Sequence, residues 1–302
     1  MKYKILFLSC VYLGSVASSS LFDPKLMPKL AVLYNQQHKP EAEHIPAGTL
    51  DHTFVKGVGY RLGPDIPDTS SNEFVDVAID SKNRIVAVGS LLITQDEEDA
   101  SQFALVRFLS DGSLDKSFGT NGHVIFDNLM GEDKYAEAVL VDDNNRIIVA
   151  GTNDSKFALY RFLENGNLDN DFDGGTPFQV PDQLDSGYDL AQDSSGRFVV
   201  VGKTTNEQND PVVQSFLVAR YTSDGVLDTS FSGDGHFVYD SGSNDHAESV
   251  AIDSSNNIYM IGGKGIGFGT DRVCIVKVKS DGSGVDTTFG ENGKIGRASC
   301  RE

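Results

Sequence analysis

The residues best spaced to bind a metal ion lie in the stretch "DNDFDGG", which begins at Asp169. It places Asp169, Asp171 and Asp173 at alternate positions and Gly174 at a sharp turn, as in the opening of a calcium-binding loop. The bidentate acid of such a loop should follow at the twelfth position, which is Val180. The spacing leaves two interpretations open: a calcium site formed by three aspartates, or solvated carboxylates in an ordinary turn.

A second set of acids recurs in the first apolar run of each repeating segment: Asp76, Glu137, Asp189 and Glu248. If these runs lined a central channel, their carboxylates could hold a metal ion there. Asp76 and Asp189 stand eight residues before the last residue of the polar turn that follows them. Glu137 and Glu248 stand nine residues before it. One residue of offset reverses the face of a strand unless a bulge intervenes, which argues against a common acidic ring.

Basic residues recur in the third run of each segment: Arg107, Arg161, Arg220 and Lys277. We expect them to pair with the abundant acids or to lay their stems over apolar surface, with an anion site as the alternative. His123 and His236 occupy equivalent positions, but no Ser or Cys stands at a recognisable nucleophile elbow, so no catalytic triad is predicted. The glycine-rich "GGKGIGFG" from Gly262 lacks phosphate-loop spacing and is interpreted as a hairpin loop.

A Leu-Asp-x-x-Phe signature and its close variant organise these residues into units. The copies are "GTLDHTF" ending at Phe54, "GSLDKSF" at Phe118, "GNLDNDF" at Phe172, "GVLDTSF" at Phe231 and "GSGVDTTF" at Phe289. The phenylalanines are 64, 54, 59 and 58 residues apart, so one unit is copied with loop insertions. We expect each signature aspartate to cap its turn and each phenylalanine to fill space between units. The aspartates are Asp51, Asp115, Asp169, Asp228 and Asp286.

Each unit reads as four short strands. A run such as "FVDVAID" leads through a polar turn to "IVAVG", then through a variable loop to "FALVRF", and "HVIF" follows the signature. Runs rich in Val, Ile, Phe and Tyr between Gly, Asn, Asp and Ser are typical of strands joined by hairpins, and helical periodicity is absent. The pattern predicts an all-β fold, a β-propeller of four-stranded antiparallel blades. A pair of β-sandwiches is the alternative.

The ends of the repeat region bear on ring closure. The first signature, from Gly48 to Phe54, supplies only the end of a unit, and the last unit is expected to stop just before its own fourth strand. An N-terminal strand near Tyr60 would then complete the final blade and hide both sheet edges. This arrangement gives four blades, and more if the natural chain continues past Lys294.

The stretch "FLVARYTSDGVLDTSFSGDG", from Phe216 to Gly235, resembles the delta-60 repeats, mostly bacterial β-propeller modules of unknown function. The resemblance covers roughly Ala47 to Lys294. It implies a propeller-like fold on an exported protein and offers no catalytic residues to carry over. The shortened third unit, "GYDLAQD", and the inserted Gly284 depart from the pattern.

We expect four segments along the chain. Residues 1–17 resemble a signal peptide, with two lysines before an apolar run, although a buried strand or helix is the alternative. Residues 18–45 form a leader or linker, and residues 46–294 form the propeller. Residues 295–302, "IGRASCRE", back-translate to a sequencing-adapter oligonucleotide and are interpreted as an artefact.

The chain is strongly acidic, with 44 Asp and Glu against 25 Lys and Arg and a formal net charge of −19. Nucleic acids and anionic membranes bind through clustered basic residues, so neither is an expected partner. Beyond the first twenty residues no apolar run is long enough to span a membrane. Of the three cysteines only Cys274 lies within the repeats, so no disulfide framework is expected. We expect a monomer that is secreted, or periplasmic or on the cell surface in a bacterium.

Repeats without a unique catalytic constellation favour a non-catalytic propeller that binds a protein or a glycan through blade-end loops. No cofactor is expected, calcium apart. The most variable loops, Ser90–Ser101, Lys203–Gln214 and Gly263–Asp271, all follow a second strand, so the ligand surface should lie on that side. The alternative is a propeller hydrolase or lactonase that uses a channel metal.

Overall fold

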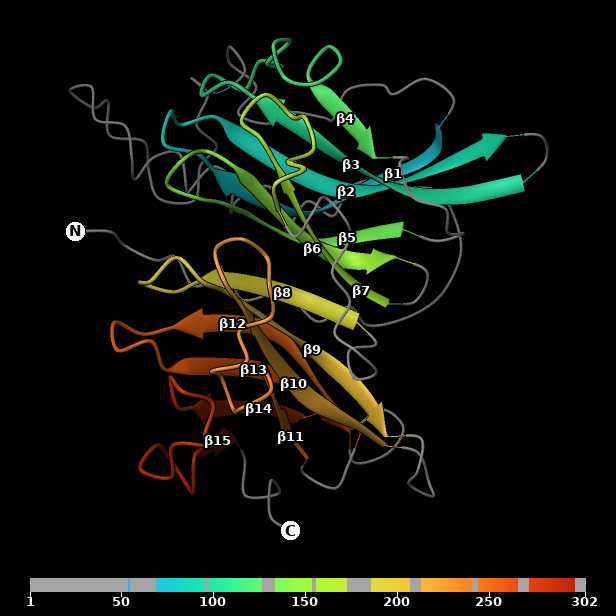
Figure 1. Ribbon diagram of the computed structural model, residues 1–302. Coiled ribbons are helices and arrows are strands. Elements are labelled where there is room, and N and C mark those ends of the chain that lie inside the picture. The colour runs from blue at the N-terminus through green and yellow to red at the C-terminus, as the bar shows by residue number, and fades with distance from the viewer. Residues whose placement is uncertain are drawn as a thin grey trace.

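The computed structural model describes residue 54 and residues 69–95, 98–126, 134–153, 156–172, 186–206, 213–240, 244–265 and 272–296. These residues form antiparallel β-sheets in a row, and the described part of the chain contains no helix that could cross a membrane (Figure 1). The prediction of an all-β fold with antiparallel blades is therefore confirmed. Each sheet is called a blade below and is numbered in chain order.

The strands follow each other as hairpins within every blade. Blade 1 contains β1 (Thr69–Ile79), β2 (Ile85–Gln95), β3 (Glu98–Phe108) and β4 (His123–Phe126). Blade 2 contains β5 (Lys134–Val141), β6 (Ile147–Asn153) and β7 (Lys156–Phe162). Blade 3 contains β8 (Ser186–Gln192), β9 (Phe198–Asn206), β10 (Val213–Tyr221) and β11 (His236–Tyr239). Blade 4 contains β12 (Asn244–Ile252), β13 (Ile258–Gly265), β14 (Arg272–Val278) and β15 (Lys294–Gly296).

Successive blades bury their apolar faces against each other, because alternate residues of each strand point to opposite faces of its sheet. One apolar cluster joins blades 1 and 2 around Phe118, a second joins blades 2 and 3 around Phe172, and a third joins blades 3 and 4 around Phe231. The face of a blade toward the following blade is called its outgoing face, and the opposite one its incoming face. The expectation that the signature phenylalanines fill the space between units is confirmed at these three positions.

The C-terminal blade corrects one expectation. The last unit does not stop before its fourth strand, because β15 pairs with β14 through Val276 and Lys294. The sequence "ENGKIG" turns at Asn292 and Gly293, both with positive φ, and returns the chain to the sheet. The edge that we expected an N-terminal strand to fill is thus occupied by the chain's own next residues. The strand expected near Tyr60 and the fourth strand expected in blade 2 at 178–180 lie outside the described residues.

Every first strand contains a β-bulge at the same position. In β1 the register shifts between Phe74 and Asp76, and β5, β8 and β12 show the equivalent shift. A glycine of the second strand faces each bulge. A Cβ atom on Gly89 would lie 1.7 Å from the backbone oxygen of Glu73. The glycine that ends each second apolar run is therefore required by the close approach of the bulged backbone.

Candidate functional site

The signature aspartates lie in tight turns and bind the basic residue of their own unit. Asp115 Oδ1 accepts hydrogen bonds from the backbone and hydroxyl of Ser117, and its Oδ2 accepts one from Arg107 Nε at 2.8 Å. Burial opposes ionisation, but these bonds and the guanidinium charge lower the pKa of Asp115. The equivalent pairs are Arg161–Asp169, Arg220–Asp228 and Lys277–Asp286. The turn-capping role is confirmed for these four aspartates, and Asp51 lies outside the described residues.

Each arginine of these pairs also reaches the following blade. Arg161 Nη1 donates to the carbonyl oxygen of Ser223 at 2.8 Å, and its guanidinium lies 4.6 Å from the ring centroid of Phe172. Arg107 bonds the carbonyl of Glu164 in the same way, and Arg220 bonds that of Ser280. This arrangement, called the latch below, joins a turn, an aromatic ring and the next blade. The expectation that the basic residues pair with acids and cover apolar surface is confirmed.

The candidate calcium loop shares one of these aspartates. Asp169 Oδ2 accepts from Arg161 Nε at 2.7 Å, and its Oδ1 accepts from the backbone amide of Asp171 at 3.1 Å. Asp171 is exposed, and Asp173 lies outside the described residues. Within the described ranges, no group of three His, Cys, Asp or Glu side chains is placed to hold a metal ion. The calcium site stays a prediction.

The bulges divide the inner-strand acids into two classes. Asp76 and Asp189 directly follow a bulge, whereas Glu137 and Glu248 occupy the bulge itself. The bulge occurs in all four strands, so it leaves the one-residue offset between the two pairs unchanged. The four carboxylates are therefore not equivalent around the axis, which agrees with the sequence argument against a common acidic ring.

The two aspartates bind the following blade. Asp76 Oδ2 accepts a hydrogen bond from the backbone amide of Val139, and Asp189 Oδ2 accepts bonds from the amide of Val250 and the hydroxyl of Ser249, all at 2.8 Å. Burial raises the pKa of Asp76 to about 6, and burial also raises the pKa of Asp189. These carboxylates tie blade 1 to blade 2 and blade 3 to blade 4.

A second contact follows the same alternation of blades. Asn145 Oδ1 accepts bonds from the backbone and hydroxyl of Ser81, and Asn256 Oδ1 accepts the same two bonds from Ser194. Blade 3 has Gly196 in place of this asparagine, and blade 2 has Ala138 in place of the bridging aspartate. Neither of these two kinds of bond can therefore form between blades 2 and 3. The described blades thus form two pairs, each joined by two kinds of contact that the interface between blades 2 and 3 lacks.

The first strands also carry polar and aromatic side chains at the end where the second hairpins lie. His246 Nε2 lies 2.9 Å from Glu248 Oε1, and the ring of Tyr188 in blade 3 lies 6.4 Å from the His246 ring. Burial and the nearby charge of Glu73 raise the pKa of Glu137. These partly exposed groups can offer hydrogen bonds and an aromatic surface to a ligand.

The variable segments after the second strands begin as strand. In blade 1 the pairing of β2 with β3 continues to Gln95 and Glu98, so most of Ser90–Ser101 belongs to an extended hairpin. The pairing of β9 with β10 continues to Asn206 and Val213, and that of β13 with β14 to Lys264 and Arg272. In blade 2 the equivalent hairpin closes at Asn153 and Lys156. In blade 1 the expectation of a loop is thus corrected to an extended hairpin, because residues such as Ile93 and Thr94 favour strand. The middle parts of the other two segments lie outside the described residues.

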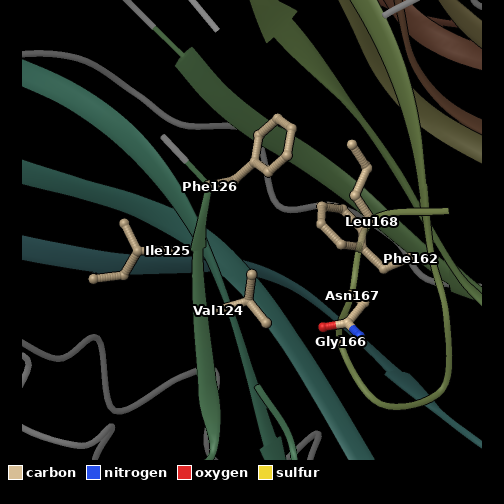
Figure 2. Close-up of a pocket in the computed structure, with 7 residues that line it drawn as sticks. All are labelled: Val124, Ile125, Phe126, Phe162, Gly166, Asn167 and Leu168. Atoms are coloured by element: carbon tan, nitrogen blue, oxygen red, sulfur yellow. The ribbon is translucent and has the colours of Figure 1, made fainter. Parts of the chain in front are cut away.

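A shallow, open crevice of about 370 Å³ lies between β4 and the turn after β7. In Figure 2 Phe126 and Val124 lie along β4, and Phe162 and Leu168 lie to their right. No titratable side chain stands among the described residues that line it. Residues 173–185, which follow this turn, are not among the described ones.

Two structural roles were not predicted from the sequence. The bond from each latch arginine to a carbonyl of the next blade has no sequence signal, because any residue supplies a carbonyl. The bulge did leave a signal, since a glycine ends every second apolar run in a position where a strand alone does not require one.

A family model described as the domain of unknown function (DUF5122) beta-propeller matches residues 83–118, 143–172 and 194–231. Each match starts in the turn between the first two strands of a blade and ends on a signature phenylalanine. No curated protein matches the sequence.

Several solved structures are distantly similar. A protein of unknown function from Dyadobacter fermentans shares 12% identity over 72% of this chain and 72% of its own, with a TM-score of 0.48. An ulvan lyase of a new polysaccharide lyase family, bound to a GlcA(1-4)Rha3S saccharide, shares 11% identity over 79% of this chain and 60% of its own, with a TM-score of 0.45. With TM-scores below 0.5, neither similarity identifies a function for this chain.

Proposed function

Residues 83–231 carry repeats of the DUF5122 β-propeller family, whose function is unknown, and from this premise we propose that the protein is an exported, non-catalytic binding propeller. Its ligand is a protein or a glycan, bound at the end of the blades where the second hairpins lie.

The observation that supports this proposal is the contrast between the two ends of the blades. At one end the turns repeat from blade to blade, and their aspartates and arginines are used in the latches. At the other end the second hairpins differ in length, from the short closure at Asn153 to the long one at Gln95. Surface segments that vary on a constant scaffold are where binding specificity is usually found.

The long hairpin of blade 1 can be tested by exchange with the short one of blade 2. Ser90 pairs with Phe103 as Thr152 pairs with Phe157, so residues 91–102 can be replaced by residues 153–156 without a change of register. Binding of the full chain and of this variant is measured on an array of glycans and against extracellular proteins. We expect the exchange to abolish or change the binding profile.

A matched control lies at the opposite end of the same blade. Lys82→Ser converts the turn at 81–83 to the sequence "SSN" found at 254–256, and we expect it to leave the binding profile unchanged. Loss of binding in the control but not in the hairpin variant would place the ligand surface at the wrong end. An unchanged profile in both variants would also contradict a binding role for this hairpin.

A further inference from the structure

The outgoing face of blade 4 is open, although the same positions are buried in the other blades. In blade 2 the side chains of Ile148, Ala150, Phe157, Leu159 and Phe172 are at most 2% exposed. Their equivalents in blade 4 are Tyr259, Ile261, Val273, Ile275 and Phe289. Val273 is 65% exposed, and the other four are half-buried. The apolar face that blade 3 covers on blade 2 is therefore open to solvent on blade 4.

This face also carries a latch without a following blade among the described residues. Lys277 Nζ lies 2.8 Å from Asp286 Oδ2 and 5.4 Å from the ring centroid of Tyr259. In the preceding blades the equivalent arginine donates to a carbonyl two residues before a turn glycine. Lys277 has three donors and can make the same bond while it keeps Asp286.

The turn glycine of the following blade completes each internal interface. A Cβ atom on Gly225 would lie 2.7 Å from the ring of Phe172, and one on Gly282 would lie 2.8 Å from the ring of Phe231. Only a glycine fits over the signature ring. In the three internal interfaces the turn reads Asn-Gly or Asp-Gly, so an Asx-Gly turn is the natural cover for Phe289.

A second copy of this chain offers no open incoming face among its described residues. The incoming face at the end of the described row is that of blade 1, where Ile85, Ala87 and Phe108 are each 7% exposed. Phe54 packs on this face beside Leu114, as Phe118 packs on blade 2. Because the face is already covered, a different sheet must supply the partner.

We propose that the outgoing face of blade 4 is an interaction surface for a β-sheet of this same repeat type, distinct from a second copy of the chain. The partner presents an Asx-Gly turn whose glycine lies on the ring of Phe289. The carbonyl two residues before that glycine accepts a hydrogen bond from Lys277 Nζ. This surface is separate from the hairpins of the proposed function, so the two proposals can fail independently.

The test uses blade 3 as the partner, because it already covers the equivalent face of blade 2. A copy of residues 181–240 is appended to the C-terminus of the full chain, in which Val273→Cys supplies a reporter thiol and Cys10 and Cys300 are replaced by Ser. The rate of thiol labelling at position 273 is compared with and without the appended copy. We expect at least a tenfold slower rate in the extended protein.

A second extended protein serves as the control. In the control, the glycine of the copy that corresponds to Gly225 is replaced by Val, whose side chain would collide with the Phe289 ring, and labelling should return to the fast rate. Equal labelling rates in both extended proteins would overturn the proposal. So would slow labelling in the unextended chain accompanied by a dimer in sedimentation equilibrium, because a second copy would then be the occupant.

Discussion

Asp76 of blade 1 accepts a 2.8 Å hydrogen bond from the backbone amide of Val139 in blade 2. The carboxylate thus bridges two sheets from a position where burial raises its pKa. A buried acid that serves as a structural bridge makes the stability of the fold depend on pH.

We expect the contribution of Asp76 to the free energy of unfolding to fall as the pH rises from about 4 to 6. The pKa of Asp76 moves from 3.8 to about 6 on folding, so the folded state holds the proton more tightly in this window. Linkage then makes stability decrease with pH, by at most roughly 3 kcal/mol at neutral pH. Urea unfolding of the Asp76→Asn variant should show a weaker pH dependence and equal or greater stability at pH 7.5.

Asp189 provides the internal check on that prediction. Burial raises the pKa of Asp189 too, and it occupies the equivalent position in blade 3. The double variant with both aspartates changed to asparagine should lose more of the pH dependence than either single variant. A slope between pH 4 and 6 that survives in the double variant would show that other groups cause it.

The latch predicts unequal effects for exchanges between arginine and lysine. In Arg161→Lys an ammonium group replaces the planar guanidinium, so the contacts with Asp169 and the Ser223 carbonyl lose their fixed fork geometry and the stacking on Phe172 is lost. We expect this change to cost about 1–2 kcal/mol. Lys277→Arg should leave stability nearly unchanged, because no described residue follows on that face to accept the second bond. Chemical unfolding of both variants measures the difference, and equal effects would argue that the carbonyl bond is unimportant.

The glycine opposite each bulge should tolerate no side chain. In Gly151→Ala the new Cβ atom would lie 2.0 Å from the backbone oxygen of Tyr135, so we expect a loss of more than about 3 kcal/mol. Gly196→Ala is the control, because its φ is +79° but its nearest neighbour would be 3.9 Å away. The control should lose only the roughly 1–2 kcal/mol that an L-residue costs in this conformation. Similar losses in circular-dichroism melts of both variants would contradict the steric explanation.

The pairing of blades predicts where the molecule opens first. Ala150 and Ala158 are both fully buried on opposite faces of blade 2, toward blade 3 and blade 1 respectively. With Cys10 and Cys300 replaced by Ser, a cysteine at 150 should react with a thiol reagent about 30-fold faster than one at 158. The reason is that the interface between blades 2 and 3 lacks two bridging contacts, each worth about 1 kcal/mol.

The native Cys274 supplies the reference for this measurement, since it is buried in the cluster between blades 3 and 4. Its labelling rate should resemble that of the cysteine at 158. If the cysteine at 150 reacts most slowly of the three, the two-pair description of the blades is wrong.

The units could be recognised from the sequence because each one repeats the same local rules. The Leu-Asp-x-x-Phe turns, the glycines after the second runs and the alternating apolar residues all depend on contacts within a unit or with its neighbour. The roles of Asp115 and Phe118 were predictable for that reason. The bond from Arg107 to the carbonyl of Glu164 was not, because a backbone acceptor leaves no trace in residue identity.

The candidate binding surface was predicted only in outline. Sequence variation located the second hairpins correctly, but the segment Ser90–Ser101 was expected as a loop and is largely strand. The length of an insertion does not tell whether its residues extend the hydrogen-bonded strand pair or form a loop outside it. The separation of Asp76 from Glu137 followed from a count of residues back from the turn, but the bulge next to them did not.

The latch gives the molecule a direction. Each arginine reaches forward along the chain, so an interface is completed only when the next turn has been made. During synthesis the signature phenylalanine ring of each blade stays uncovered until the next blade has been translated. The interfaces between blades are then buried in order from the N-terminus to the C-terminus. At each stage the blade made last has an uncovered apolar face and is the one most prone to misassembly.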